Sequence, residues 1–424
     1  VAIAASEAWN EQLSRIKATF RTERERRIFY TAMYHFMIAP QTWCDVSGDY
    51  MGADLKVHRG AKYEMLTTWS LWDTYRAAHP LATIIMPDRM PDYAKTMMAI
   101  FREHGELPMW HLTSNETYCM VGEPGIPVLA DMILKNECGD INLKEAYEAM
   151  KASLLPTEYS EVHRGKDYLA HLGFLPYDGR EGETVAKNLE YYLASWAVAQ
   201  VAGRLGYKQD SIRFYNLSQN YRKLWDQRVK CMRAIDSKGN LRPLPQDFNP
   251  QFQTGDYTEG NPWQYAFLVP HDVNGLAELM GGKDSLNAHL DALLNAPSDL
   301  GDNHNPDISG LIGQYAHGNE PSHHVLYMYN YVGQPRKTQR RVRQVMDELY
   351  TDQPAGLCGN EDVGQMSAWY IMSALGLYQV EPCGGVYQLG SPIVEEAVIP
   401  LPGDKTFTIR THGGSDKAYY VKKY

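Results

Sequence analysis

The chain has 424 residues and a formal net charge of −10, with 44% hydrophobic and 22% charged residues. This composition indicates a globular protein rather than a disordered one. Binding to nucleic acid is not expected, because phosphate contacts need clustered basic residues and the charge balance is acidic. The densest basic run, residues 336–343, is interpreted as the solvated face of a helix. No stretch of about 18 apolar residues occurs, so we predict no membrane span.

Amphipathic patterns dominate the first 376 residues and predict about twelve helices. Short polar loops join most of them, and consecutive helices with short links pack as antiparallel pairs. We therefore expect a mainly α fold, an (α/α)6 toroid with a central funnel; the closure rests on the helix count, because no internal repeat is visible. The expected helices are residues 7–34, 65–80, 92–104, 128–135, 143–153, 184–205, 210–229, 272–280, 284–294, 322–331, 336–349 and 365–375.

The pattern changes after Gly376. Alternating β-branched and aromatic residues, separated by Gly and Pro, predict short strands at residues 386–389, 397–399, 406–410 and 418–421. The expected division is a helical catalytic toroid over residues 1–376, followed by the start of a small C-terminal β-region over residues 377–424 that looks incomplete.

A first candidate for chemistry is Glu259, which lies in a segment rich in aromatic residues (256–265). Gly260 and Pro262 interrupt regular structure here, so Glu259 is expected on a loop. Aromatic neighbours can remove water from a carboxyl group, which raises its pKa and keeps it protonated, as a general acid requires. The alternative is a carboxylate that caps a helix or lies on the surface.

A second candidate segment is residues 314–324, where Pro321 predicts the start of a helix. Asn319 and Glu320 come just before it and offer the hard oxygen ligands that calcium prefers. The adjacent His323 and His324 would point about 100° apart on a helix, so a hydrogen-bonding role suits them better than joint metal ligation. For Asn319 the alternative is a plain helix cap.

The third candidate segment, residues 359–370, is a turn that leads into an apolar helix. Asp362 is a candidate general base, and the alternative is that Asp362 or Asn360 caps the helix. No segment is decisive alone. Three carboxylate-bearing junctions of loop and helix can nevertheless converge at one end of a toroid.

Five ordered segments of this sequence resemble glycoside hydrolase family 92, the calcium-dependent exo-α-mannosidases. They are residues 71–76 (LWDTYR), 257–265 (YTEGNPWQY), 270–273 (PHDV), 317–324 (HGNEPSHH) and 359–370 (GNEDVGQMSAWY). The resemblance implies an (α/α)6 catalytic domain that is normally preceded by a β-sandwich, and we expect that sandwich to be absent here. It also implies an inverting mechanism, with Glu259 as general acid, Asp362 as general base and Asn360 assisting.

The same resemblance implies a calcium ion at Asn319 and Glu320, with Gln264 as a further ligand. Trp72 and Asp73 match the pocket for a terminal mannose, and the expected substrate contacts also include Trp110, His317 and His323. Gly318 stands where a Glu is expected in some α-1,2-specific members, so the linkage stays open.

The expected function is calcium-dependent, exo-acting hydrolysis of terminal α-mannosides with inversion, on a mannose-containing oligosaccharide or glycoprotein glycan. The resemblance also implies an extracytoplasmic location, periplasmic or secreted. Two alternatives stay open: a sugar-binding toroid without catalysis, and a metal-independent toroid glycosidase of other specificity. A hydrolysis assay with and without a chelator separates all three.

Overall fold

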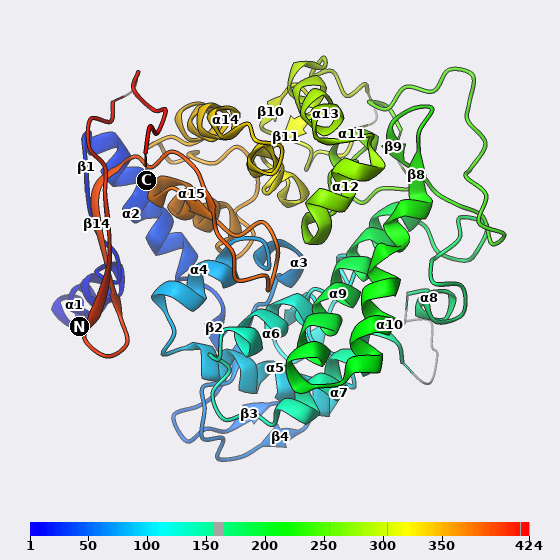
Figure 1. Ribbon diagram of the computed structural model, residues 1–424. Helices are drawn as coiled ribbons and strands as arrows, with labels where there is room; N and C mark the ends of the chain where they lie inside the picture. The colour runs from blue at the N-terminus through cyan, green and yellow to red at the C-terminus, as the bar shows by residue number, and fades with distance from the viewer. Residues whose placement is uncertain (157–163, 254, 303, 416, 424) are drawn as a thin grey trace.

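The computed structural model describes the chain except residues 157–163, 254, 303, 416 and 424, and it is mainly helical (Figure 1). Its α-helices are α1 (Ala2–Leu13), α2 (Glu23–Phe36), α3 (Leu71–Thr74), α4 (Ala78–Ile85), α5 (Met90–His104), α6 (Gly125–Leu134), α7 (Leu143–Leu154), α8 (Lys166–Leu172), α9 (Thr184–Leu205), α10 (Lys208–Ser218), α11 (Pro262–Tyr265), α12 (Val273–Leu279), α13 (Lys283–Asn295), α14 (Pro335–Glu348) and α15 (Gln365–Leu375). The described residues also form the 3-10 helices η2 (Gln219–Leu224), η3 (Pro270–Asp272), η4 (Glu320–Ser322) and η5 (Val325–Asn330).

Most strands are two-residue segments in antiparallel pairs. These are β2 (Gln41–Thr42) with β5 (Leu66–Thr67), β3 (Tyr50–Met51) with β4 (Val57–His58), β6 (His111–Leu112) with β7 (Asn115–Glu116), β8 (Trp225–Asp226) with β9 (Cys231–Met232), β10 (Leu311–Ile312) with β11 (Tyr315–Ala316), and β12 (Leu377–Tyr378) with β13 (Gln388–Leu389). The largest sheet has the order β1 (Lys17–Phe20), β14 (Val394–Leu401), β15 (Lys405–Arg410), and both of its pairings are antiparallel.

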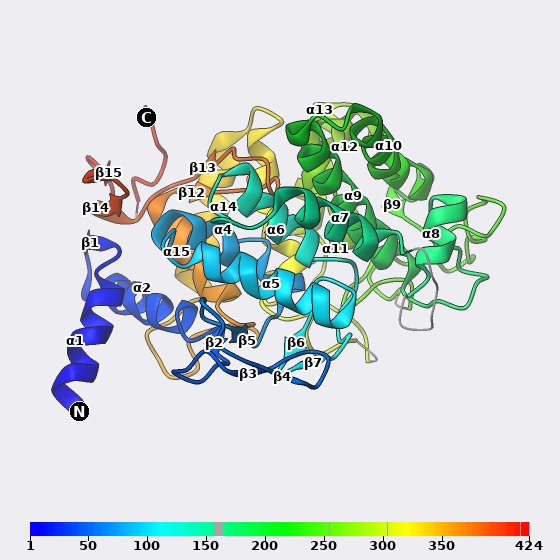
Figure 2. The same cartoon turned by 90° about the horizontal axis from the view of Figure 1, so that it is seen from below.

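Two helices form much of the core. Every residue of α15 is buried, and α9 is buried along most of its length. A helix that is apolar on all sides must be surrounded by other elements. Accordingly α9 packs against α6, α7 and α10, and α15 packs against α2, α4 and α14. Figure 2 shows the short hairpins β2 to β7 along one edge of this helical body.

The helices at residues 184–205 and 365–375 match the predicted bounds. The predicted single helix over residues 7–34 is wrong, because β1 separates α1 from α2. Thr22 precedes α2 and forms a capping box with Glu25. The Thr22 side chain accepts from the backbone N–H of Glu25, and the Glu25 side chain accepts from the backbone N–H of Thr22. This Ser/Thr-x-x-Glu pattern is a start signal that can be read from sequence.

Several further expectations differ from the structure, among them the single helix over residues 65–80, which is divided into β5, α3 and α4. The helix expected at 210–229 ends at Ser218 and continues as η2 and β8, while the one expected at 322–331 is the 3-10 helix η5. Residues 418–421 form no strand. The three-stranded sheet also takes β1 from the N-terminal part of the chain, so residues 377–424 do not form their sheet alone.

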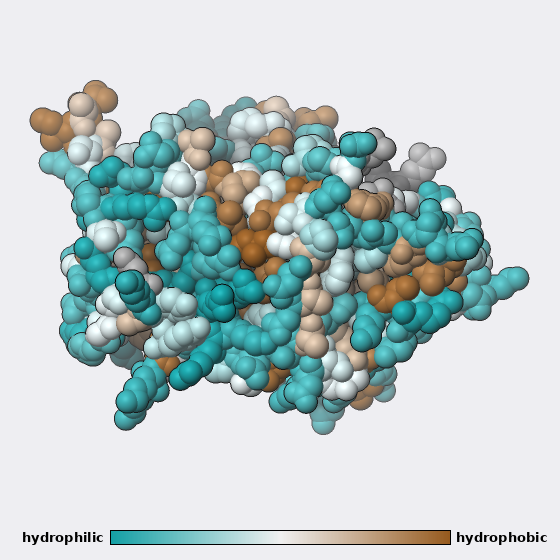
Figure 3. Space-filling view, turned by 90° about the horizontal axis from the view of Figure 1, so that it is seen from above, coloured by the Kyte–Doolittle hydropathy of each residue, from teal (hydrophilic) through white to brown (hydrophobic). Residues whose placement is uncertain are grey.

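No helix in the described residues is long and apolar enough to cross a membrane. On the face shown in Figure 3, hydrophilic residues predominate and the apolar ones form separate patches.

Candidate active site

A pocket forms where the three candidate segments meet. It holds about 390 Å³ of space, part of it open to solvent. Its lining comes from chain segments that are far apart in sequence: Asp73, Trp110, Cys119, Met120, Glu259, Asp307, Gly318, Asn319, Glu320, Asn360 and Asp362. Seven of the predicted site residues therefore share one pocket: Asp73, Trp110, Glu259, Asn319, Glu320, Asn360 and Asp362.

Glu259 lies on the loop before α11, in a left-handed backbone conformation with φ of 46°. Such a conformation costs a non-glycine residue about 1–3 kcal/mol and persists only where the surroundings impose it. The amide of Asn319 supplies such a constraint, since its Nδ2 donates both to the Glu259 backbone oxygen (3.0 Å) and to Glu259 Oε2 (3.1 Å).

The environment of Glu259 favours its protonated form. Burial is the main cause that raises its pKa, to about 7, and the negative charge of Asp307 adds to it. The hydrogen bond from Asn319 opposes the shift, because it stabilises the carboxylate. Much of the Glu259 population therefore keeps a proton near neutral pH, as a general acid must.

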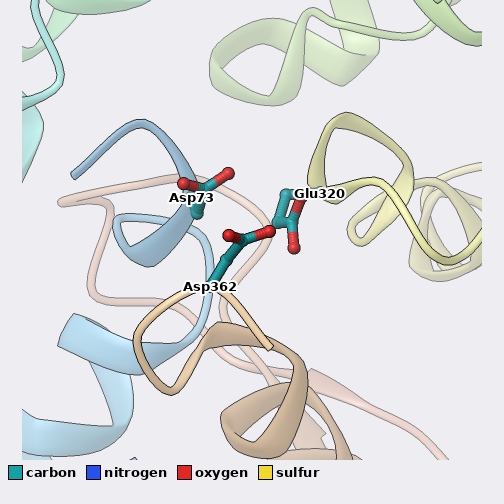
Figure 4. A group of neighbouring side chains, drawn as sticks. All are labelled: Asp73, Glu320 and Asp362. Atoms are coloured by element: carbon teal, nitrogen blue, oxygen red, sulfur yellow. The ribbon is translucent and has the colours of Figure 1, made fainter. Parts of the chain in front are cut away.

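Three carboxylates from separate segments face one another beside this loop. Asp73 on α3, Glu320 on η4 and Asp362 before α15 place carboxylate oxygens within 4.8 Å of one another (Figure 4). Burial raises the pKa of all three, and their mutual repulsion contributes for Asp73 and Glu320. Grouped carboxylates become stable as anions when a cation sits among them.

Asp362 projects from a strained turn. Asp362, Val363 and Gly364 all have positive φ values, of 50°, 56° and 94°. Glu361 holds this turn, because its carboxylate accepts from the backbone N–H groups of Gly364 and, at 3.0 Å, Ser367. The helix-capping role that the sequence allowed for Asp362 or Asn360 therefore belongs to Glu361, and the Asp362 side chain is left to the pocket.

Asn360 lies at the exposed edge of the pocket and donates its amide to Asp307 Oδ1 at 3.1 Å. Among the expected sugar contacts, Trp110 is partly exposed and lines the pocket. Trp72 does not: its ring is 1% exposed, and the guanidinium of Arg76 lies 5.2 Å from it. The structure therefore places Asp73 at the pocket and Trp72 in the core behind it.

The two histidines expected to contact substrate are buried structural residues. His317 uses Nδ1 with the Tyr315 hydroxyl (2.8 Å) and Nε2 with the Tyr350 hydroxyl (2.7 Å). His323 uses Nε2 with the His317 backbone oxygen (3.0 Å) and Nδ1 with Gln365 (2.8 Å). With all four ring nitrogens engaged, neither histidine is placed to reach a sugar, and we correct both assignments.

The polar atoms of Gln264 are also bound within the protein. Its Oε1 accepts from the backbone N–H of Asn261 at 2.8 Å, as part of the capping box of α11. Its Nε2 donates to the Gln314 backbone oxygen at 2.7 Å. The side chain holds the loop after Glu259 in place, and the expectation that it is a calcium ligand is not supported.

Three residues that line the pocket, Asp307, Cys119 and Met120, were not predicted from sequence. Asp307 lies in a loop rich in Asn, Asp and Pro (residues 302–307), a composition that marks loops without saying where they fold. Cys119 and Met120 follow the β6–β7 hairpin and carry no sequence signal for a site. Gly318 packs tightly instead: a Cβ there would lie 2.1 Å from Ser309 Oγ.

The donor set fits a calcium ion. Asn319 Oδ1 and Glu320 Oε1 are buried and have no hydrogen-bond partner among the described residues. Both atoms are hard oxygen donors beside the carboxylate of Asp73, and calcium takes six to eight such ligands, including waters. Unsatisfied buried oxygens next to grouped carboxylates are accounted for when a cation binds there.

The model of the glycosyl hydrolase family 92 catalytic domain matches residues 1–424. The chain belongs to this family. A solved GH92 α-mannosidase from Bacteroides thetaiotaomicron, in complex with mannoimidazole, is 36% identical over 99% of this chain and 55% of its own, with a TM-score of 0.91. A GH92 inverting mannosidase from the same organism is 34% identical over 97% of this chain and 57% of its own, with a TM-score of 0.86.

An uncharacterised secreted glycosidase of Arthroderma benhamiae is 24% identical over 96% of this chain and 50% of its own length. The chain thus spans about half the length of these relatives.

Proposed function

We propose that this chain carries the active site of an exo-acting, calcium-dependent α-mannosidase that inverts the anomeric configuration. The observation that carries the proposal is the pairing of Glu259 and Asp362 in one pocket, beside a carboxylate cluster with unused oxygen donors. Membership of family 92 and the mannosidase neighbours support the substrate class.

In this mechanism Glu259 donates its proton to the leaving glycosidic oxygen. Its pKa of about 7 keeps the proton available near neutral pH and still allows its release. Asp362 accepts a proton from a water molecule on the opposite face of the sugar, while Asn360 and Asp307 border the same pocket. An inverting enzyme holds its acid and base far enough apart to admit this water.

Asn319, Glu320 and Asp73 would hold the calcium ion, which would polarise the sugar hydroxyls that bind to it and help to distort the ring. Asp362 keeps the role of base, although its carboxylate lies in the same cluster. Trp110 offers an aromatic face at the pocket wall, suited to packing against a sugar ring.

We also propose an arrangement of the helices, a natural substrate and a cellular location. The helices are arranged as an (α/α)6 toroid over residues 1–376, with residues 377–424 starting a β-region. The natural substrate is a mannose-containing oligosaccharide or glycoprotein glycan. The location is extracytoplasmic, and the secreted relative supports it.

The test is release of mannose from α-1,2-, α-1,3- and α-1,6-mannobiose, with EDTA, and with calcium restored after EDTA. We expect hydrolysis of at least one linkage, loss of activity on chelation and recovery with calcium. Full activity in a verified metal-free preparation would refute the metal role, and no release from any α-mannoside would refute the function.

A further inference from the structure

Gln365, the first residue of α15, connects the three segments that carry the clustered carboxylates. Its side chain is completely buried. Its Oε1 accepts from the backbone N–H groups of Ala77 and Ala78, both at 3.0 Å. Its Nε2 lies 2.8 Å from Nδ1 of His323.

The direction of these hydrogen bonds is fixed by chemistry. Two backbone N–H groups face Oε1, so the amide oxygen must point at them and the amide nitrogen at His323. His323 Nε2 lies against the His317 backbone oxygen at 3.0 Å, so it must carry the ring proton and Nδ1 must accept. Burial lowers the His323 pKa to about 3, which keeps the ring in this neutral form.

The hydrogen-bond partners of Gln365 lie three to five residues after Glu320 or Asp73, and Gln365 itself lies three residues after Asp362. The backbone N–H of His323 donates to the backbone oxygen of Glu320 at 3.0 Å, and the backbone N–H of Gln365 donates to the backbone oxygen of Asp362 at 3.1 Å. On the third segment Asp73 is four residues before Ala77, in the turn that ends α3. One amide side chain thus ties together three short turns, each with a carboxylate at its start.

The turn that carries Asp362 needs such a restraint. Its three consecutive positive φ values are unfavourable for Asp362 and Val363, so an unrestrained loop would relax away from them. Such a movement would take the Asp362 carboxylate away from Asp73 and Glu320. Outer hydrogen-bond partners commonly set the affinity of a metal site in this indirect way.

We propose that Gln365 is a positioning residue, which fixes the relative placement of Asp73, Glu320 and Asp362. It contacts neither substrate nor metal and acts through the backbone of the three segments. The inference rests on the proposed function for its effect on calcium and on rate, whereas the placement itself is a claim about geometry.

The chain offers a matched control in Gln379, a second buried glutamine that is 1% exposed. Its Oε1 accepts from Lys135 Nζ at 2.9 Å, and its Nε2 donates to Asp131 Oδ1 at 3.0 Å. None of these residues lines the pocket. Replacement of either glutamine by Met keeps similar bulk and removes buried hydrogen bonds, so both variants are expected to unfold at a lower temperature.

The experiment measures calcium affinity by isothermal titration without substrate, alongside kcat, for Gln365→Met and Gln379→Met. We expect Gln365→Met to bind calcium about 10–100-fold more weakly and to lose kcat to a similar degree. The Gln379→Met variant should match the wild type in both. Equal calcium affinity in two folded variants would overturn the proposal and leave Gln365 a core residue like any other.

A second variant covers the case in which Gln365→Met does not fold. In Gln365→Glu, the protonated carboxyl group can accept from Ala77 and Ala78 and donate to His323, as the amide does. We expect it to bind calcium nearly as tightly as the wild type, and a loss of about 10-fold or more in this folded variant would contradict the proposal.

A crystal structure of a Gln365 variant separates this inference from the proposed function. Separations among the Asp73, Glu320 and Asp362 carboxylates that equal those of the wild type would refute the positioning role, whatever the enzyme does. If the wild type binds no calcium and cleaves no mannoside, the proposed function fails, and displaced carboxylates in the variant would still support the positioning role.

Discussion

Asn319 donates its side-chain amide to both the backbone and the carboxylate of Glu259, and Asn319 Oδ1 is buried with no hydrogen-bond partner in the described part of the chain. The nitrogen end of this amide faces the candidate acid, while the oxygen end remains for a cation. The two functions proposed for the pocket are thus joined in one side chain.

Replacement of Asn319 by Ala should therefore change two measurable quantities. Calcium affinity should fall about 10–100-fold, because an oxygen donor is lost. The alkaline limb of kcat/KM should move to higher pH, because the lost hydrogen bond no longer lowers the Glu259 pKa. Calcium titration and a pH–rate profile at saturating calcium measure the two effects. An unchanged calcium affinity would exclude Asn319 from the donor set.

Asp307→Asn should move the alkaline limb of the kcat/KM pH profile to lower pH. The Asp307 charge is the second-largest cause of the raised Glu259 pKa, after burial. Without that charge the Glu259 proton is lost more easily, so activity should decline at a lower pH than in the wild type. Asn keeps an oxygen that can accept from Asn360, which makes the change mainly one of charge. A limb that does not move would show that Asp307 does not influence the acid.

Glu259→Gln should nearly abolish hydrolysis of natural mannosides and spare substrates with very acidic leaving groups. Such groups depart with little need for a proton, so the loss of the acid costs them far less than the usual 10²–10⁴-fold. The measurement compares kcat/KM for a mannobiose and an activated aryl mannoside in both proteins. Equal losses on the two substrates would remove Glu259 from the acid role.

Asp362→Asn should lower kcat about 10²–10⁴-fold, the usual contribution of a general base. Asn360→Ala is the comparison and should cost less, since an amide can orient water but cannot take its proton. Calcium titration of Asp362→Asn separates the base from a metal ligand. If calcium binding is lost with the activity, Asp362 belongs to the metal site and another base must be found.

Much of the site was predictable from sequence, because motifs place residue types close together in the chain. Glu259, Asn319, Glu320 and Asp362 each stand at a loop next to a helix start, and all four line the pocket. The sequence does not show which partner each polar side-chain atom binds in the folded protein. Gln264, His317 and His323 lie within or beside the same motifs, yet their polar atoms are bound to the protein itself.

In the fold, too, elements set by local sequence were predictable and elements set by distant contacts were not. The bounds of α9 and α15 followed from long apolar runs that end at Gly206 and Gly376. The strand β1 escaped prediction because its pairing partner, β14, lies more than 370 residues later in the chain. Asp307 was missed for a similar reason, since only the fold brings its loop to Glu259.

The most direct test of the account is the configuration of the first sugar released, followed by proton NMR during early hydrolysis of an α-mannoside. A general acid at Glu259 and a water-activating base at Asp362 require attack from the face opposite the leaving group. We expect β-mannose as the first product, with the α-anomer appearing only later as the free sugar equilibrates. An initial α-anomer would mean a retaining enzyme and would contradict the pairing of Glu259 with Asp362.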